Sequence, residues 1–155
     1  MDDQVVNTWQ IHNRINLYLL DAIKPEALSS VTATSKIRSV ARMFAHMHNV
    51  RLMWLKTSAP ELLGEIEKIE PSEAARDKKR LRRALEQSGQ AMAALIDTGL
   101  KTGKIKGFKP HPIGFVGYAI SHESYHRGEI CIALTESGYK LDDEILYGLW
   151  EWGKR

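Results

Sequence analysis

The feature that most constrains the fold is the stretch from Ser121 to Ile130, which carries His122 and His126 in a segment patterned as a helix. Apolar residues recur with the two histidines at steps of three and four, and the full set is Phe115, Ala119, His122, His126, Ile130 and Ala133. This spacing predicts one buried helical stripe. Side chains four apart on a helix share a face, with Cβ atoms roughly 5–6 Å apart, so both imidazoles can reach one metal ion. Buried polar groups need partners. We therefore expect either a shared metal or hydrogen bonds to neighbouring helices, and the spacing alone does not decide between them.

Length and composition indicate one soluble globular domain covering residues 1–155. The net charge of +3 is small, so it gives no reason to expect general affinity for nucleic acid. The single cysteine, Cys131, excludes a disulfide framework and predicts a reducing, cytoplasmic location. The amino terminus lacks an apolar signal core, and no run approaches the roughly 18 apolar residues that a membrane span needs. We therefore expect no membrane partner.

The apolar pattern predicts four principal helices, at residues 4–22, 36–56, 72–100 and 113–137. A connection at 57–71, with a short helical turn at 61–69, separates the second helix from the third. A basic loop punctuated by Gly and Pro occupies 101–112, and a tail at 139–155 contains one further short helix. There is no convincing strand pattern. We therefore predict an all-α fold, an antiparallel four-helix bundle with a short additional C-terminal helix, in which metal sites would be built from side chains on facing helices.

The second predicted helix carries two more histidines, His46 and His48, which point about 200° apart around the helix axis, so both cannot face one site. An almost continuous apolar stripe contains His48, and its members are Ile37, Ala41, Phe44, His48, Leu52 and Leu55. Periodicity therefore predicts that His48 is the more buried of the two.

Several other polar residues have a structural interpretation that we prefer. The basic run at 77–83 begins with Asp77 and has Glu73 and Glu86 on either side, which predicts a solvated helix face rather than a nucleic-acid site. We expect His12 to be a structural residue with a partner near the core, and His111 to lie in a surface loop.

The residues flanking the histidine pair are open to two interpretations. Glu123 and Glu129 are either acceptors for the N–H of a metal-bound histidine or surface carboxylates, and we prefer the surface interpretation for each. We interpret Arg127 as a partner in a structural salt bridge, and Cys131 as a small buried residue.

The segment from His122 to Ile130 resembles the His-Glu-x-x-His-Arg-Gly-Gln-Ile signature of the DinB family, the DinB/YfiT-like metalloenzymes. The run from Ser39 to Met47 resembles the second-helix pattern of that family, in which an apolar run ends in Ala-His-Leu/Met and a Trp, here Trp54, follows eight positions later. The tail segments at 136–143 and 147–152 also resemble family tails, so the resemblance covers nearly the whole chain.

The resemblance implies a four-helix bundle that holds one divalent metal through three histidines, one from the second helix and two from the fourth. Carried over residue by residue, the ligands are His46, His122 and His126. This choice of His46 conflicts with the burial pattern that favours His48, and we follow the family motif. One departure is Tyr125, where many relatives carry another His; that position is not among the carried-over ligands. Imidazole ligands suit zinc, nickel or iron, so ligand type does not identify the metal.

The family contains thiol-dependent transferases and isomerases that act with low-molecular-weight thiols, and many members of unknown activity. The resemblance therefore favours an enzyme that uses a metal-activated thiol to attack a small electrophilic substrate. The alternatives are a metal-hydroxide hydrolase, a stress-related metal-binding bundle without turnover, and a bundle whose histidines only form hydrogen bonds. Family members are often homodimers, and the aromatic tail, with Tyr147, Trp150 and Trp152, favours a homodimer here. Docking of the tail on its own bundle is the alternative.

Overall fold

Four long α-helices carry most of the residues that the structure describes, which are 1–36, 38–74 and 77–155. In this computed structural model they are α1 (Asp2–Ala22), α2 (Val40–Ser58), α3 (Lys78–Thr102) and α4 (Pro112–Glu136). A short helix, α5 (Asp143–Gly148), follows them, and three 3₁₀ segments lie at η1 (Pro25–Ser29), η2 (Pro60–Leu62) and η3 (Trp152–Lys154). The prediction of an all-α helical bundle with a short additional C-terminal helix is confirmed.

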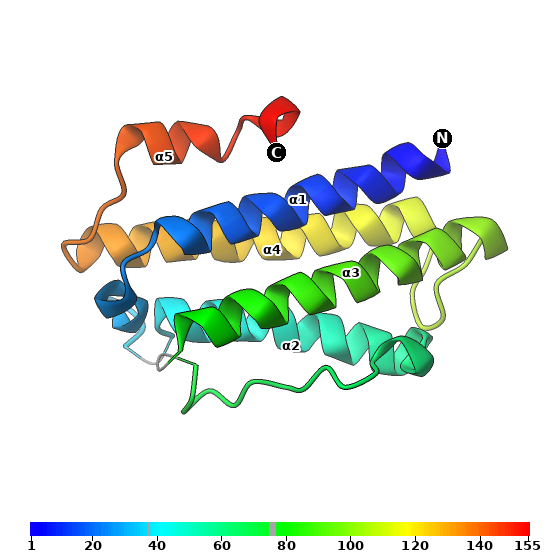
Figure 1. Ribbon diagram of the computed structural model, residues 1–155, viewed down its shortest axis with the longest axis horizontal. Coiled ribbons are helices and arrows are strands. Elements are labelled where there is room, and N and C mark those ends of the chain that lie inside the picture. The colour runs from blue at the N-terminus through cyan, green and yellow to red at the C-terminus, as the bar shows by residue number, and fades with distance from the viewer. Residues whose placement is uncertain (37, 75–76) are drawn as a thin grey trace.

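The helices do not simply alternate in direction. Figure 1 shows that α1 and α4 run one way along the bundle and that α2 and α3 run the other way. The connection from α2 to α3 returns along the length of the bundle, so the two helices that it joins start at the same end (Figure 1). With 19 residues, α2 is about 28 Å long, and the connection at 63–77 has enough residues to return along that length. The antiparallel arrangement is therefore not confirmed, because α2 and α3 are parallel.

Capping residues fix where the helices begin. The Ser39 hydroxyl accepts the backbone N–H of Arg42 at 3.2 Å, so α2 begins later than the predicted residue 36. The Asp77 carboxylate accepts the N–H of Arg80 at 3.0 Å and starts α3, whereas the predicted helix began at residue 72. Residues 72–74 form a turn instead. Residues 37, 75 and 76, which the two predicted helices include, lie outside the described residues.

The interior consists of two hydrophobic clusters with buried polar side chains between them. One cluster contains Leu19, Phe44, Leu85 and Ile130, and the other contains Trp9, Leu55, Ile96 and Phe115. We call the side chains between them the polar layer, and they are His12, Asn16, His48, Arg51, Ser88 and Glu123. Each long helix passes from one cluster through this layer to the other, so the layer lies at mid-height of the bundle.

The C-terminal tail docks on α1 of its own chain. The Arg155 guanidinium lies 3.7 Å above the centre of the Tyr18 ring, and Arg14 Nη2 donates to the Arg155 carbonyl oxygen at 3.1 Å. This docking leaves Tyr147 and Trp150 exposed, at 74% and 81% of their surface. Among the described helices, none combines the length and the apolar character that crossing a membrane requires.

Candidate metal centre

Three histidines from two helices converge at one point on the side of the bundle. His46 comes from α2, and His122 and His126 come from consecutive turns of α4. The Nε2 atom of His122 lies 3.3 Å from Nε2 of His46 and 3.2 Å from Nε2 of His126. His126 is buried, His122 is half-buried and His46 is exposed, so the cluster opens to solvent on the side of His46.

The spacing of these nitrogens fits a shared metal. A metal bound by imidazole nitrogens at roughly 2.0–2.1 Å brings those nitrogens to about 3 Å from one another. A hydrogen on Nε2 of His122 can be donated to only one of its two neighbours, so hydrogen bonding alone leaves one close contact unsatisfied. A cation at the centre would satisfy all three lone pairs. The three histidines can therefore hold a metal ion.

The protonation states of the histidines favour metal binding. Glu129 Oε1 accepts a hydrogen bond from Nδ1 of His126 at 2.7 Å, which leaves Nε2 of the neutral imidazole free to act as a ligand. Burial lowers the pKa of His46 and of His122 most. Charge on His126 lowers the pKa of both further, and charge on His122 also lowers the pKa of His46. At neutral pH these two side chains are therefore uncharged and present lone pairs.

His48 lies outside the histidine cluster, although the burial pattern and the family motif had favoured different histidines of the second helix. His48 is fully buried, with Nδ1 3.0 Å from the Ser88 hydroxyl and Nε2 2.9 Å from the Glu67 carbonyl oxygen. The prediction that His48 is the more buried histidine is confirmed, and His46 is the one that meets α4. The ligand role of His46, His122 and His126 stays a prediction.

Glu123 is not a surface carboxylate, so our preferred interpretation of it was wrong. Its side chain lies in the polar layer and is 2% exposed. Arg51 binds it through two hydrogen bonds, Nε to Oε1 at 2.7 Å and Nη2 to Oε2 at 2.8 Å. His12 Nε2 and Asn16 Nδ2 each lie 2.8 Å from Oε2. Burial by itself would raise the pKa of Glu123, but the charge and hydrogen bonds of Arg51 and the hydrogen bond from His12 outweigh it and hold the pKa well below its usual range.

Arg51 extends this network to α3. Its Nη1 donates to the Leu85 carbonyl oxygen at 2.8 Å and to the Ser88 hydroxyl at 3.2 Å, and its guanidinium lies 5.0 Å from the centre of the Trp9 ring. The network therefore ties α1, α2 and α3 to the residue next to His122. Sequence reasoning missed Arg51 and Asn16. The available signal was their spacing, three residues after His48 and four after His12, within otherwise apolar helix faces.

His12 has the structural role that we expected, whereas Arg127 lacks the salt bridge that we expected for it among the described residues. Nε2 of His12 donates to Glu123, so Nδ1 accepts from Arg127 Nη1 at 3.1 Å, which requires a neutral imidazole. Burial lowers the pKa of His12 and outweighs the opposing effect of Glu123, in agreement with this geometry. Arg127 also donates to Asn16 Oδ1 at 2.7 Å and to the Ser124 hydroxyl at 3.0 Å. Its partners in the described residues are therefore neutral groups rather than a salt-bridge carboxylate.

Glu129 is one-quarter exposed but is oriented toward His126, so it matches the acceptor interpretation better than the surface one that we preferred. His111 is exposed, as expected, and its Nδ1 accepts the N–H of Gly114 at 2.9 Å, which caps α4. Cys131 lies outside the cluster, and burial raises the pKa of its thiol, so it remains protonated at neutral pH.

Aromatic side chains border the centre on the side of His122. The Tyr118 ring is nearly parallel to the His122 ring, with centroids 6.4 Å apart. Tyr118 in turn contacts Trp54 and Phe108, at centroid distances of 5.7 and 5.5 Å. This border of the centre is apolar.

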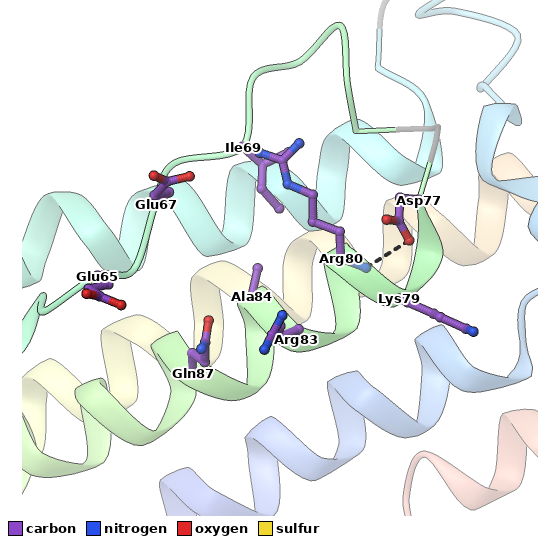
Figure 2. A pocket seen from close by; sticks show the side chains of 9 residues that line it. All are labelled: Glu65, Glu67, Ile69, Asp77, Lys79, Arg80, Arg83, Ala84 and Gln87. Carbon is purple, nitrogen blue, oxygen red and sulfur yellow. Dashed lines mark hydrogen bonds between the residues drawn. The ribbon is translucent and has the colours of Figure 1, made fainter.

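A cavity of about 590 Å³ lies apart from the three clustered histidines. Figure 2 shows it between α3 and the segment that returns from α2, with Glu65 and Glu67 on one side and Arg83 and Gln87 on the other. Its side chains are mixed in charge and include none of the clustered histidines. The candidate centre is therefore the histidine cluster rather than this groove.

A helical bundle with three converging imidazoles at its side defines the class: a helical-bundle protein with a candidate mononuclear metal site. The chain belongs to the DinB family, whose family model matches residues 1–151. The family resemblance predicted from the motifs is thus confirmed over nearly the whole chain. DinB proteins bind metals, and the three-histidine cluster fits that property. No curated protein and no solved structure is similar enough to the chain to be matched to it.

Proposed function

We propose that this protein is a divalent-metal-dependent enzyme, an S-transferase or isomerase that uses a low-molecular-weight thiol to attack a small electrophile. The observation that carries the proposal is the convergence of three histidines at a position open to solvent on the side of His46, with Nε2 of His122 3.3 Å from that of His46 and 3.2 Å from that of His126. When bound there, a divalent metal such as zinc, nickel or iron would lower the pKa of a coordinated thiol and so provide a thiolate at neutral pH.

The protein's own residues supply position and access. Glu129 fixes the orientation of His126 by accepting from its Nδ1. The polar layer fixes α4 next to His122 through Glu123 and Arg51. The exposure of His46 leaves one side of the cluster open for a ligand from solvent, and the ring of Tyr118 offers an apolar surface against which the electrophile can pack.

In the proposed transfer, the thiol loses its proton to solvent, and the sulfur then forms a bond to an electrophilic carbon of the substrate. The leaving group departs from that carbon with the bonding electron pair and takes up a proton from water. In an isomerisation, the sulfur adds to one carbon of a substrate double bond, and the π electrons of that bond move onto an adjacent electron-withdrawing group. Rotation about the resulting single bond is followed by departure of the thiolate, which restores the double bond. Neither sequence needs an oxidant or a reductant.

The surrounding carboxylates favour this proposal over hydrolysis. A metal-hydroxide hydrolase commonly uses a carboxylate as general base within hydrogen-bond reach of the attacked water. Glu123 is buried and bonded to Arg51, and Glu129 is bonded to His126. Within the described residues, no carboxylate joins the histidine cluster. Without a carboxylate base in the cluster, the site suits a nucleophile that a bound metal would activate directly.

A cobalt-substituted sample tests the proposal. Purified protein loaded with Co²⁺ should gain a new near-ultraviolet band when mercaptoethanol is added, because a thiolate–cobalt bond absorbs there. The variant His48→Ala should behave like the unaltered protein, while His46→Ala should bind no cobalt. Cobalt binding with no response to thiols would contradict thiol chemistry and leave a hydrolase or a metal-binding bundle without turnover. Elemental analysis of the native protein identifies the metal.

A further inference from the structure

The face of α4 that points away from the bundle is uncharged and partly apolar. Six exposed positions follow one another along it at alternating steps of three and four residues, and we call them the outer stripe: Tyr118, Ser121, Tyr125, Gly128, Ile132 and Thr135. A helix face that remains in water normally carries charged side chains. The outer stripe carries none, and Tyr118, Tyr125 and Ile132 expose 40%, 66% and 53% of their surface. A continuous exposed face of this kind indicates a binding surface.

Large and small side chains alternate along the outer stripe. Each kind returns every seven residues, which is the repeat of helices that pack against one another as a coiled coil. The large set is Tyr118, Tyr125 and Ile132, and the small set is Ser121, Gly128 and Thr135, which the half-buried Gly114 extends by one repeat. The repeat spans most of α4, whose 25 residues make it about 37 Å long. The outer stripe therefore has the pattern and the length of a surface that pairs with another helix.

The packing of the single chain does not explain the glycine at position 128. A Cβ atom built on Gly128 meets no atom within 4 Å. A glycine inside a helix costs about 1 kcal/mol relative to alanine, and close approach of another group to the backbone is a common reason for one. Gly128 also lines a cavity of about 470 Å³ between α4 and the C-terminal tail, together with Trp150, which is 81% exposed. The outer stripe and the exposed Trp150 therefore form one continuous surface.

We propose that the outer stripe binds the outer stripe of a second copy of this chain, with the two α4 helices antiparallel about a two-fold axis. Reversing one helix places its large set opposite the small set of the other, so each large side chain packs onto a small one. A parallel pair would place large residues against large ones and leave gaps between the small ones. An uncharged face also meets its own copy without repulsion between like charges, and two-fold dimers are built from self-complementary patches of this kind.

The antiparallel register centred nearest to the middle of α4 places Tyr118 level with Gly128 of the second copy and Tyr125 level with Ser121 of the second copy. Tyr118 of one copy then lies at the mouth of the cavity that Gly128 and Trp150 line in the other. Because the Tyr118 ring is stacked near His122, with centroids 6.4 Å apart, the tail of each copy borders the candidate metal centre of the other. This interface does not depend on the function proposed above.

Sedimentation of Gly128→Glu tests the surface, because a Cβ at this position has free space in its own chain. The unaltered protein should sediment at about twice 17.6 kDa, and Gly128→Glu at 17.6 kDa, since pairing would bury an unpaired carboxylate in each copy. Thr98→Glu, which adds the same charge at an exposed position of α3, is the matched control and should remain a dimer. Circular dichroism should show the same helix content in all three. A monomeric unaltered protein, or a dimeric Gly128→Glu, would overturn the inference.

Cross-linking tests the direction of the two helices. Ser121→Cys and Ile132→Cys are each combined with Cys131→Ser, so that every chain carries one cysteine. In the antiparallel pair the two copies of position 121 are offset by about 6 Å along the helix axis, and the two copies of position 132 by about 27 Å. A short bismaleimide should therefore link the Ser121→Cys protein into a covalent dimer and leave the Ile132→Cys protein unlinked on a denaturing gel. Linkage of both proteins would indicate a parallel pair and linkage of neither an interface elsewhere, and each of these results overturns the inference.

Discussion

Arg51 of α2 and Glu123 of α4 form a two-point ion pair inside the bundle, with Nε–Oε1 at 2.7 Å and Nη2–Oε2 at 2.8 Å. Glu123 lies between His122 and His126 in the sequence, so the same turn of α4 faces the candidate metal on one side and the buried polar layer on the other. The pair therefore connects the position of the candidate ligands to the packing of all four long helices.

Removing the carboxylate should destabilise the protein and weaken metal binding together. Glu123→Ala leaves the buried Arg51 charge unpaired, and we expect a loss of about 3–5 kcal/mol in the free energy of unfolding. Metal affinity should fall as well, because the turn of α4 that carries His122 loses its contacts with the polar layer. Urea denaturation and a competitive metal titration measure the two effects. Glu86→Gln, which alters a surface pair, should change the unfolding free energy by less than about 1 kcal/mol. Unaltered stability of Glu123→Ala would show that the pair is not the central tie we describe.

The three clustered histidines should each be needed for metal. We expect His46→Ala, His122→Ala and His126→Ala to lose most of the bound divalent metal, because two remaining imidazoles make a poor chelate. His48→Ala should retain metal but unfold more easily, since it removes a buried side chain bonded to Ser88. Mass spectrometry of the metal content decides the matter. Full occupancy in the three cluster variants, or loss of metal only in His48→Ala, would refute this ligand set.

His12 should make the protein sensitive to mild acid. Its folded-state pKa lies below the ordinary value of 6.5 because burial outweighs the attraction of Glu123. Below pH 6.5 the unfolded chain therefore binds a proton that the folded protein does not, so this contribution to stability is complete above that pH and is lost as the pH falls. The slope from one such group is at most about 1.4 kcal/mol per pH unit.

The comparison of His12→Gln with the unaltered protein isolates this effect, because the other buried histidines titrate in both. Gln can still donate to Glu123 but does not take up a proton. Unfolding free energies measured by urea between pH 5 and pH 8 should fall less steeply toward acid in the variant. Identical pH profiles would mean that His12 is not the neutral, buried imidazole that its contacts with Glu123 and Arg127 require.

The exposed aromatic residues of the tail predict a homodimer. Docking on α1 leaves Tyr147 and Trp150 largely in solvent, and exposed apolar groups of this kind commonly mark an interface. We expect sedimentation at tens of micromolar to give about twice the 17.6 kDa mass of the chain, and Trp150→Ser to shift the protein toward the monomer. Met53→Ser, at an exposed apolar residue on α2, is the control and should leave the mass unchanged. A single 17.6 kDa species of the unaltered protein would exclude the dimer.

The sequence by itself determined the local features of this protein. Helix periodicity is a property of neighbouring residues, so the apolar stripe, the pairing of His122 with His126 and the burial of His48 could all be predicted from spacing. The family motif then added His46 to the predicted ligands, although periodicity alone predicted that His46 is less buried than His48. The starts of two helices were less well predicted. Ser39 and Asp77 cap α2 and α3 later in the chain than the residue pattern alone predicted.

Only the tertiary structure decided which residues meet across helices. The face of α2 that meets α4 depends on how the four helices pack, and this packing brings His46 to the cluster and leaves His48 bonded to Ser88. The same packing surrounds Glu123 with Arg51, His12 and Asn16. Its carboxylate, which the sequence alone predicted to be exposed, is therefore buried and bonded to these three partners. The parallel course of α2 and α3 likewise depends on the path of a connection that has no periodicity. Contacts between residues far apart in the chain leave no regular spacing in the sequence, and this is why the packing had to supply them.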